Sequence, residues 1–161
     1  MTSDTDLAFR EATEDDVPGI IALLADDFLG HTRESESDGT PAAYGAAFLA
    51  IQESLHNFLF VATQNGTIVG TFQLTLIPGL SFKGGLRAQI EAVRVAADRR
   101  GGGIGGRMIR FAIDRARAEG CVMVQLTMNK QRTETLRFYE SLGFNATHEG
   151  FKLMLPMPQG V

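Results

Sequence analysis

Apolar and polar positions along the chain follow two different periods, and these predict the order of its elements. Alternation over a few residues is typical of a strand with one buried face, whereas recurrence every three or four residues is typical of an amphipathic helix. Alternation and short apolar runs predict strands at residues 7–11, 58–63, 67–77, 87–95, 121–127, 144–147 and 151–155. The helical period predicts helices at about residues 13–28, 42–54, 104–119 and 133–142.

The order of these elements predicts the fold class. Asn65-Gly66 lies between two predicted strands and is a strong signal for a two-residue hairpin. Further along the chain, the strand at 87–95, the helix at 104–119 and the strand at 121–127 form one parallel crossover unit. Hairpins followed by such a unit predict an α+β fold with a mixed, mostly antiparallel central sheet of about 6–7 strands and helices on both faces. We expect residues 1–161 to form a single domain with a frayed tail at residues 1–6.

Composition excludes several classes of protein. The 161 residues carry a net charge of −4, which gives no basic field for nucleic acid. We find no apolar run near 18 residues, so we expect no membrane partner, and the acidic N-terminus is unlike a signal peptide. Cys121 is the single cysteine, so no internal disulfide forms, and the three histidines are not spaced as metal ligands. We therefore expect a cytoplasmic protein without a metal.

A glycine-rich stretch at residues 101–106 joins the strand at 87–95 to the helix at 104–119. Glycines let several backbone N–H groups turn toward one ligand, and the start of a helix favours a negative charge. Arg99, Arg100 and Arg107 add positive charge beside it. The stretch therefore predicts a loop that binds a phosphate or pyrophosphate, although a glycine-rich turn without a ligand stays an alternative.

Two common phosphate motifs do not fit this loop. Gly101, Gly103 and Gly106 satisfy the letters of the dinucleotide fingerprint, but the strand that follows ends in Thr127 and Met128 instead of the acid that holds a ribose. A nucleotide P-loop needs Lys and then Ser or Thr after its last glycine, whereas this chain has Arg107 and then a methionine.

A third pattern fits the loop and its surroundings. Residues 100–105 match the Arg/Gln-x-x-Gly-x-Gly/Ala pyrophosphate loop of the GNAT superfamily of N-acetyltransferases. Upstream, residues 90–95 resemble that family's fourth strand, and Phe138-Tyr139-Glu140-Ser141-Leu142-Gly143-Phe144 resembles its closing motif. The resemblance is strong over residues 87–150 and implies an acetyl-coenzyme A-dependent enzyme with the acyltransferase fold described above.

The resemblance also implies which residues hold acetyl-coenzyme A. In the family the parallel strands splay apart, and the pantetheine arm pairs with the edge of the earlier strand, here through the backbones of Val93 and Val95. Asn129 matches a polar position beside that arm, although a turn asparagine is an equally good interpretation. The full set expected to bind the cofactor is Val93, Arg94, Val95, Arg100, Gly101, Gly102, Gly103, Ile104, Gly105, Gly106, Arg107, Asn129 and Tyr139.

Two residues are candidates for catalysis. Glu91 occupies a strand position where many family members place a base, and the acceptor amine must lose a proton before it attacks. Its plain alternative is a solvated residue paired with Arg87 or Arg94. Tyr139 matches the family tyrosine near the thioester sulfur, and its alternative is a packed helix residue with a satisfied hydroxyl. A covalent route through Cys121 is disfavoured because no histidine lies near it in sequence.

The acceptor is the part that the sequence defines least. In the family the first two helices and their loop form the wall of the acceptor cleft. The excess of acidic residues there could attract a cationic amine, and a solvated charged loop is the alternative. A small-molecule amine, an antibiotic, and a protein lysine or N-terminus all stay open as acceptors. The alternative to an enzyme is a non-catalytic sensor or regulatory module that binds acyl-coenzyme A. The sequence does not determine the oligomeric state, and a homodimer is one option. The residues of this chain in that region are Asp26, Asp27, Glu34, Glu36, Asp38, Tyr44 and Phe48.

Overall fold

The computed structural model describes residues 6–26 and 41–156. Two compact units make up the chain, Met1–Leu126 and Thr127–Val161. The first unit contains the sheet and most of the helices, and the second contains one helix and the C-terminal segment. The expected loop at residues 30–40 and Phe28 lie outside the described residues.

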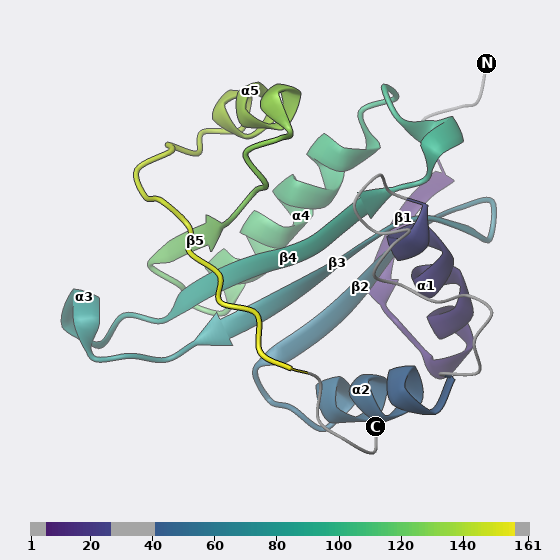
Figure 1. Ribbon diagram of the computed structural model, residues 1–161, viewed down its shortest axis with the longest axis horizontal. Coiled ribbons are helices and arrows are strands. Elements are labelled where there is room, and N and C mark those ends of the chain that lie inside the picture. The colour runs from purple at the N-terminus through teal and green to yellow at the C-terminus, as the bar shows by residue number, and fades with distance from the viewer. Residues whose placement is uncertain (1–5, 27–40, 157–161) are drawn as a thin grey trace. The chain divides into compact units, whose positions relative to one another are not determined.

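The first unit is built on a five-stranded sheet in the order β1-β2-β3-β4-β5 (Figure 1). Neighbouring strands are antiparallel except β4 and β5, which are parallel and joined by helix α4. The mixed, mostly antiparallel sheet with helices on both faces confirms the predicted fold class, although five described strands are fewer than the 6–7 expected. The strands are β1 Leu7–Glu11, β2 Asn57–Gln64, β3 Thr67–Ile77, β4 Arg87–Val95 and β5 Met123–Leu126.

One face of the sheet packs against α4, Ile104–Ala118. The helix buries Met108, Ile109 and Ala112 completely, as its apolar stripe requires. Its Phe111 ring lies 5.3 Å from Phe60 of β2 and 5.0 Å from Phe9 of β1, in edge-to-face and stacked contacts. This aromatic cluster fixes the helix on the sheet, and the start of the helix is thereby held at the end of β4.

The opposite face packs against α1, Val17–Ala25, and α2, Pro41–Gln52 (Figure 1). Ile20 of α1, Phe48 of α2 and Val61 of β2 form a buried cluster there. The entry to α1 is a short 3-10 helix, η2 Glu14–Asp16, whose Asp16 carboxylate accepts from Arg10 and from the Thr13 backbone. These contacts hold the pKa of Asp16 far below its usual range, with the Arg10 hydrogen bond as the main cause.

Several predicted elements differ from the structure. Residues 81–84 form a short α3, Ser81–Gly84, where a loop was expected, and Phe82 and Lys83 there have left-handed φ values of 53° and 57°. The second unit contains α5, Thr133–Ser141. The strands expected at 144–147 and 151–155 are wrong for the described residues, which form no strand after β5. Alternation alone does not make a strand, because each strand also needs a hydrogen-bonding neighbour.

Candidate functional site

Strands β4 and β5 pair along only part of their length. The parallel register runs from Arg87 with Met123 to Ile90 with Leu126 and stops there. Strand β4 continues to Val95, and over these last residues its hydrogen-bonded neighbour is β3 alone. The edge of β4 beyond Ile90 therefore pairs with no described strand on the β5 side, which is the feature that the family resemblance implies; its use by a ligand stays a prediction.

A bulge marks the point where the pairing with β5 ends. The register between β3 and β4 shifts between Thr71 and Gln73, so that β4 has one extra residue there. Ala92 lies in this extra segment with φ of 52°, a left-handed conformation that alanine seldom adopts. A bulge bends its strand and increases the local twist, which explains why β4 leaves β5 at this point.

The glycine stretch forms the connection that the sequence predicted. A 3-10 turn, η3 Ala97–Arg99, follows β4 and leads into two glycines with left-handed backbone, Gly101 with φ of 82° and Gly103 with φ of 80°. Gly103 is the N-cap of α4, so the first amides of the helix open beside it. An added Cβ at either glycine would meet no protein atom within 4 Å. Glycine is required there by the backbone conformation, and the space beside it is open to a ligand.

The arginines around this loop are engaged with the protein itself. Arg100 donates from Nε to the Val95 carbonyl at 3.1 Å and from Nη2 to the Asp26 carbonyl at 3.1 Å. Arg94 donates from Nη1 to the Val93 carbonyl at 2.8 Å. A ligand that uses the carbonyls of Val93 and Val95 would therefore take the place of these two side chains.

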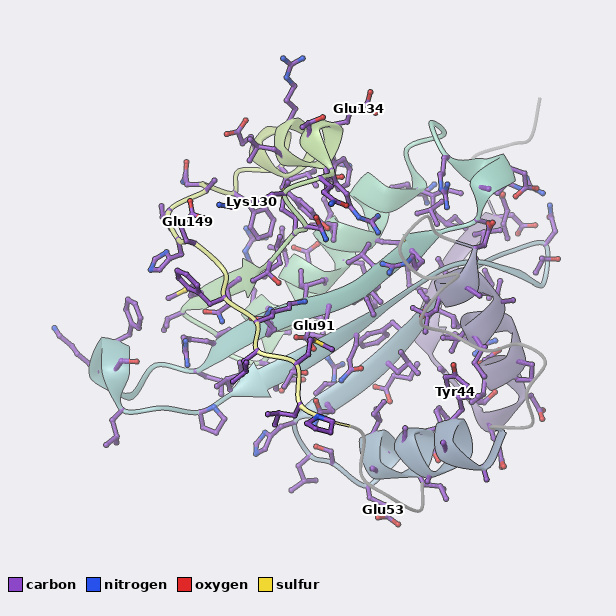
Figure 2. The ribbon with its side chains drawn as sticks, in the orientation of Figure 1. Tyr44, Glu53, Glu91, Lys130, Glu134 and Glu149 are labelled. Carbon is purple, nitrogen blue, oxygen red and sulfur yellow. The ribbon has the colours of Figure 1, made fainter. Side chains whose placement is uncertain are left out.

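Glu91 lies on the face of β4 that α1 and α2 share. The register places Glu91, labelled in Figure 2, beside Gln73. Gln73 pairs with Leu59, and Leu59 packs against the cluster of Ile20 and Phe48. The Glu91 side chain is exposed and forms no ion pair with any residue in the described part of the chain. The alternative in which Glu91 pairs with Arg87 or Arg94 is therefore wrong for this structure.

The same face carries a set of polar side chains that the sequence did not single out as a group. Asn57, Thr75, Gln89 and Gln125 form one row across β2 to β5, because each lies opposite the next in register. Gln125 donates to Gln89 at 2.7 Å, and Thr75 donates to Asn57 at 2.8 Å. The period of two along β4 was the available signal, since it places Arg87, Gln89 and Glu91 on one face.

The candidate residues of the second unit lie on and before α5. The Tyr139 ring is half-buried and contacts Phe138 at 5.0 Å and Phe144 at 5.8 Å in edge-to-face arrangements. Asn129 is exposed, and its side-chain oxygen accepts from the backbone N–H of Gln131 at 2.9 Å. Asn129 thus forms the turn that its alternative interpretation described, and its role toward a cofactor stays a prediction.

The expected wall of the acceptor cleft is described only in part. Phe48 is 4% exposed and belongs to the core, so it is unavailable to an acceptor. Tyr44 of α2 is half-buried (Figure 2), and Asp26 is exposed. The four other acidic residues named for this wall lie at positions 27–38, outside the described residues.

The described residues contain neither a cluster of metal ligands nor a helix suited to a membrane. No group of three His, Cys, Asp or Glu side chains comes together as metal ligands within 6–26 and 41–156. Among the same residues no helix has the length and apolar character to cross a membrane.

Comparison with known proteins identifies the family. Residues 18–144 match the model of the acetyltransferase (GNAT) family, a span that includes the sheet, the glycine loop and α5. The chain belongs to the GNAT family. Members of this family transfer an acetyl group from acetyl-coenzyme A to an amine, so the protein is an acetyl-coenzyme A-dependent N-acetyltransferase.

Three relatives illustrate the range of the GNAT family around this chain. The glucosamine 6-phosphate N-acetyltransferase of Trypanosoma brucei brucei is 29% identical over 155 residues, which are 96% of this chain and all of the relative. The aminoalkylphosphonate N-acetyltransferase of Salmonella typhimurium is 27% identical over 88% of this chain and 87% of the relative. A crystal structure of a transcriptional regulator from Bacillus halodurans C-125 is 45% identical, with a TM-score of 0.90 over 92% of this chain and 99% of that one.

The loop and the split strand of this GNAT protein fit the chemistry of acetyl-coenzyme A. A pyrophosphate needs several N–H donors at a helix start, which Gly103 and the first turn of α4 supply. A pantetheine arm needs an unpaired strand edge, which β4 supplies beyond Ile90. Both features belong to the first unit, so one compact body contains the two parts of the expected cofactor site.

Proposed function

We propose that this protein transfers the acetyl group of acetyl-coenzyme A directly to the primary amine of a small molecule, in a complex that contains both substrates. The single observation that carries the proposal is the open edge of β4 beyond Ile90, which leads into the glycine loop at the start of α4. This edge would align an extended cofactor with the loop, and Glu91 lies where the pairing with β5 ends.

Glu91 is proposed as the base, acting directly or through water. An alkyl ammonium has a pKa of about 10.4, so about 1 in 2,500 molecules is a free amine at pH 7. Deprotonation then costs about 4–5 kcal/mol at 1.36 kcal/mol for each unit of pH. A carboxylate that is exposed and without an ion pair in the described residues, as Glu91 is, can accept that proton.

Tyr139 is proposed as the donor to the departing thiolate. The proposal comes from the family motif that spans residues 138–144, in which the tyrosine lies near the thioester sulfur. A phenol is able to donate a hydrogen bond to sulfur as negative charge develops there. The half-buried ring, held between Phe138 and Phe144, limits the positions that its hydroxyl can reach.

Direct transfer is favoured over an acetyl-cysteine intermediate. Burial, and secondarily the charge of Glu119, raise the pKa of the Cys121 thiol. A raised pKa leaves less of the nucleophilic thiolate at neutral pH. Cys121 is also the single cysteine of the chain, so no other thiol could take its place.

The relatives support a small-molecule acceptor. By name, the Trypanosoma enzyme acts on glucosamine 6-phosphate and the Salmonella enzyme on aminoalkylphosphonates, and each acceptor is a small amine. The Bacillus protein described as a transcriptional regulator favours a second candidate, a sensor that binds acyl-coenzyme A without turnover. Retention of a carboxylate at Glu91 and a phenol at Tyr139 argues for the catalytic role.

Two measurements on the purified protein test the proposal. We expect acetyl-coenzyme A at 100 times its Kd to stabilise the fold by about 2.7 kcal/mol, and NAD to leave the melting temperature unchanged. We expect thiol release from acetyl-coenzyme A when a panel of small amines is added. Stabilisation without thiol release across the panel would favour the sensor, and equal stabilisation by NAD would contradict the cofactor assignment.

A further inference from the structure

The N-terminal half of β4 contains an arginine whose charge has no acidic partner among residues 6–26 and 41–156. Arg87 makes one hydrogen bond in the described residues, from Nη1 to the neutral Gln125 side chain at 3.3 Å. Its Nε is buried and has no hydrogen-bond partner there. A buried donor without an acceptor is costly, so this guanidinium is set up to receive one.

Two other buried Nε atoms show why Arg87 differs. The Nε of Arg115 is also unpartnered, but its guanidinium pairs with Glu119 at 2.9 Å and lies over the Phe58 ring. Arg94 likewise has an unpartnered Nε, and its Nη1 donates to a backbone carbonyl. Arg87 contacts a neutral side-chain amide and no carboxylate among the described residues, so its positive charge stays available to a ligand.

The amides beside Arg87 are oriented so that donors are left over. Arg87 donates to Gln125, and Gln125 donates to Gln89, so each oxygen in this short chain is used as an acceptor. The Gln89 NH₂ group and the Nε–H of Arg87 then have no acceptor within the part of the chain that the structure describes. Three or more donors around one positive charge suit an oxyanion with several oxygens, because each oxygen can accept a bond.

The position of Arg87 relates this donor set to the reaction. Arg87 and Glu91 lie on the same face of β4, four residues apart, which is about 13 Å between their Cα atoms. The two side chains can lean along the strand, so a small molecule could contact both with opposite ends. The amine end would lie at Glu91, and the other end would lie at Arg87.

We propose that Arg87, together with Gln89 and Gln125, binds a phosphoryl or phosphonate group on the acceptor and thereby determines acceptor specificity. The inference rests on the proposed function for the amine end of the acceptor. The anion site itself stands on the geometry of the first unit. Arg87 holds the acceptor by its anionic end, and the reacting amine reaches Glu91.

Direct binding of inorganic phosphate tests the site without turnover. The protein is first saturated with coenzyme A so that the glycine loop is occupied, and the Nε–Hε signals of the arginines are followed by NMR during a phosphate titration. The Arg87 signal, assigned by its loss in Arg87→Gln, is expected to shift saturably. Arg117→Gln is the matched control, because Arg117 is exposed on α4 and pairs with Asp114. An Arg87 signal that does not respond to phosphate would overturn the site.

Kinetics test the specificity. Arg87→Gln is expected to lower kcat/KM for glucosamine 6-phosphate by about 10- to 100-fold, mostly through KM, and to change kcat/KM for glucosamine less than about threefold. Arg87→Lys keeps the charge without the fork of donors, so an intermediate loss is expected. Equal losses with both acceptors would overturn the proposal. If no amine is acetylated while the Arg87 signal still responds to phosphate, the proposed function fails and the anion site stands.

Discussion

The two halves of β4 have the same backbone direction and different neighbours. Arg87–Ile90 lies between β3 and β5 and is hydrogen-bonded on both edges, whereas the residues from Glu91 to Val95 have β3 on one edge alone. The paired half offers a ligand only its side chains, because its N–H and C=O groups are used in the sheet. The half beyond the bulge offers its backbone as well.

Because of this difference, the two halves of β4 are suited to different substrates. A cofactor arm with amide groups is suited to the open half, where recognition needs a strand edge and no particular side chain. An acceptor is suited to the paired half, where Arg87 and Gln89 project from the face on which Glu91 follows just beyond the pairing. Ala92, with φ of 52°, lies at the boundary between the two halves. In the proposed arrangement, the bulge would let one strand contact two ligands without a long loop.

The largest effect is expected at the glycine loop that ends the open half. Gly103→Val should weaken coenzyme A binding by at least about 100-fold, because a branched side chain would occupy the phosphate space and strain a left-handed residue. Calorimetry with coenzyme A measures this. Gly120→Val is the matched control, since Gly120 has φ of 78° and equally open space at the other end of α4. Similar affinity losses in both variants would show that backbone strain, and not a phosphate site, explains the effect.

The next effect concerns the departing thiolate, to which Tyr139 is proposed to donate. Tyr139→Phe should lower kcat by about 10- to 1,000-fold, the range for a lost acid or oxyanion-type donor. The KM for acetyl-coenzyme A should change far less, because the loop and the strand edge carry the binding. Circular dichroism checks the fold. A fall in melting temperature with unchanged kcat would make Tyr139 a packing residue between Phe138 and Phe144.

Glu91 stands at the boundary, and its effect should depend on the acceptor. Glu91→Gln keeps the size of the side chain but cannot accept a proton. With an amine of pKa near 10, the loss in kcat should grow as the pH falls from 8 to 6, because the free amine falls from about 1 in 100 to about 1 in 10,000 molecules and the reaction depends more on a base. An amine of pKa below 6 is already neutral in this pH range, so Glu91→Gln should lower kcat for it only slightly. A pH–rate profile for both amines measures this, and equal losses for the two would exclude Glu91 as the base.

Much of the fold around β4 could be predicted from the sequence. Strand β3 agrees with the prediction at both ends, and β4 agrees as well, because alternation and the Asn65-Gly66 turn are local signals. Asn65 and Gly66 have φ values of 51° and 75°, as a hairpin of this type requires. The glycine loop was also predictable, because left-handed backbone, as at Gly101 and Gly103, strongly favours glycine and so appears in the sequence as a run of glycines.

Other features depend on contacts between distant residues. Phe151 and Leu153 alternate as in a strand, yet they are 93% and 88% exposed, because alternation does not say which partner a segment has. The bulge at Ala92 is invisible in sequence, since alanine does not signal positive φ. The donor set at Arg87 needs Gln125 of β5, which is 38 residues away along the chain. The register of β4 with β5 brings these two residues together, and the sequence does not show that register.

The smallest effect is expected when glycine replaces alanine at two positions of β4, where the two changes in stability should have opposite signs. Ala92→Gly should raise the free energy of unfolding by about 0.5–1 kcal/mol, because the relief of left-handed strain, about 1–2 kcal/mol, exceeds the added entropy of glycine in the unfolded chain. For a chain of 161 residues this is a rise in melting temperature of about 1–4 °C. Ala88→Gly, in the paired half, should lower the melting temperature, because Ala88 is fully buried and loses a packed methyl group. Thermal melts of the two variants give the comparison directly. Falls of equal size at both positions would mean that Ala92 has ordinary strand geometry in solution, and the explanation of the split in terms of the bulge would then be wrong.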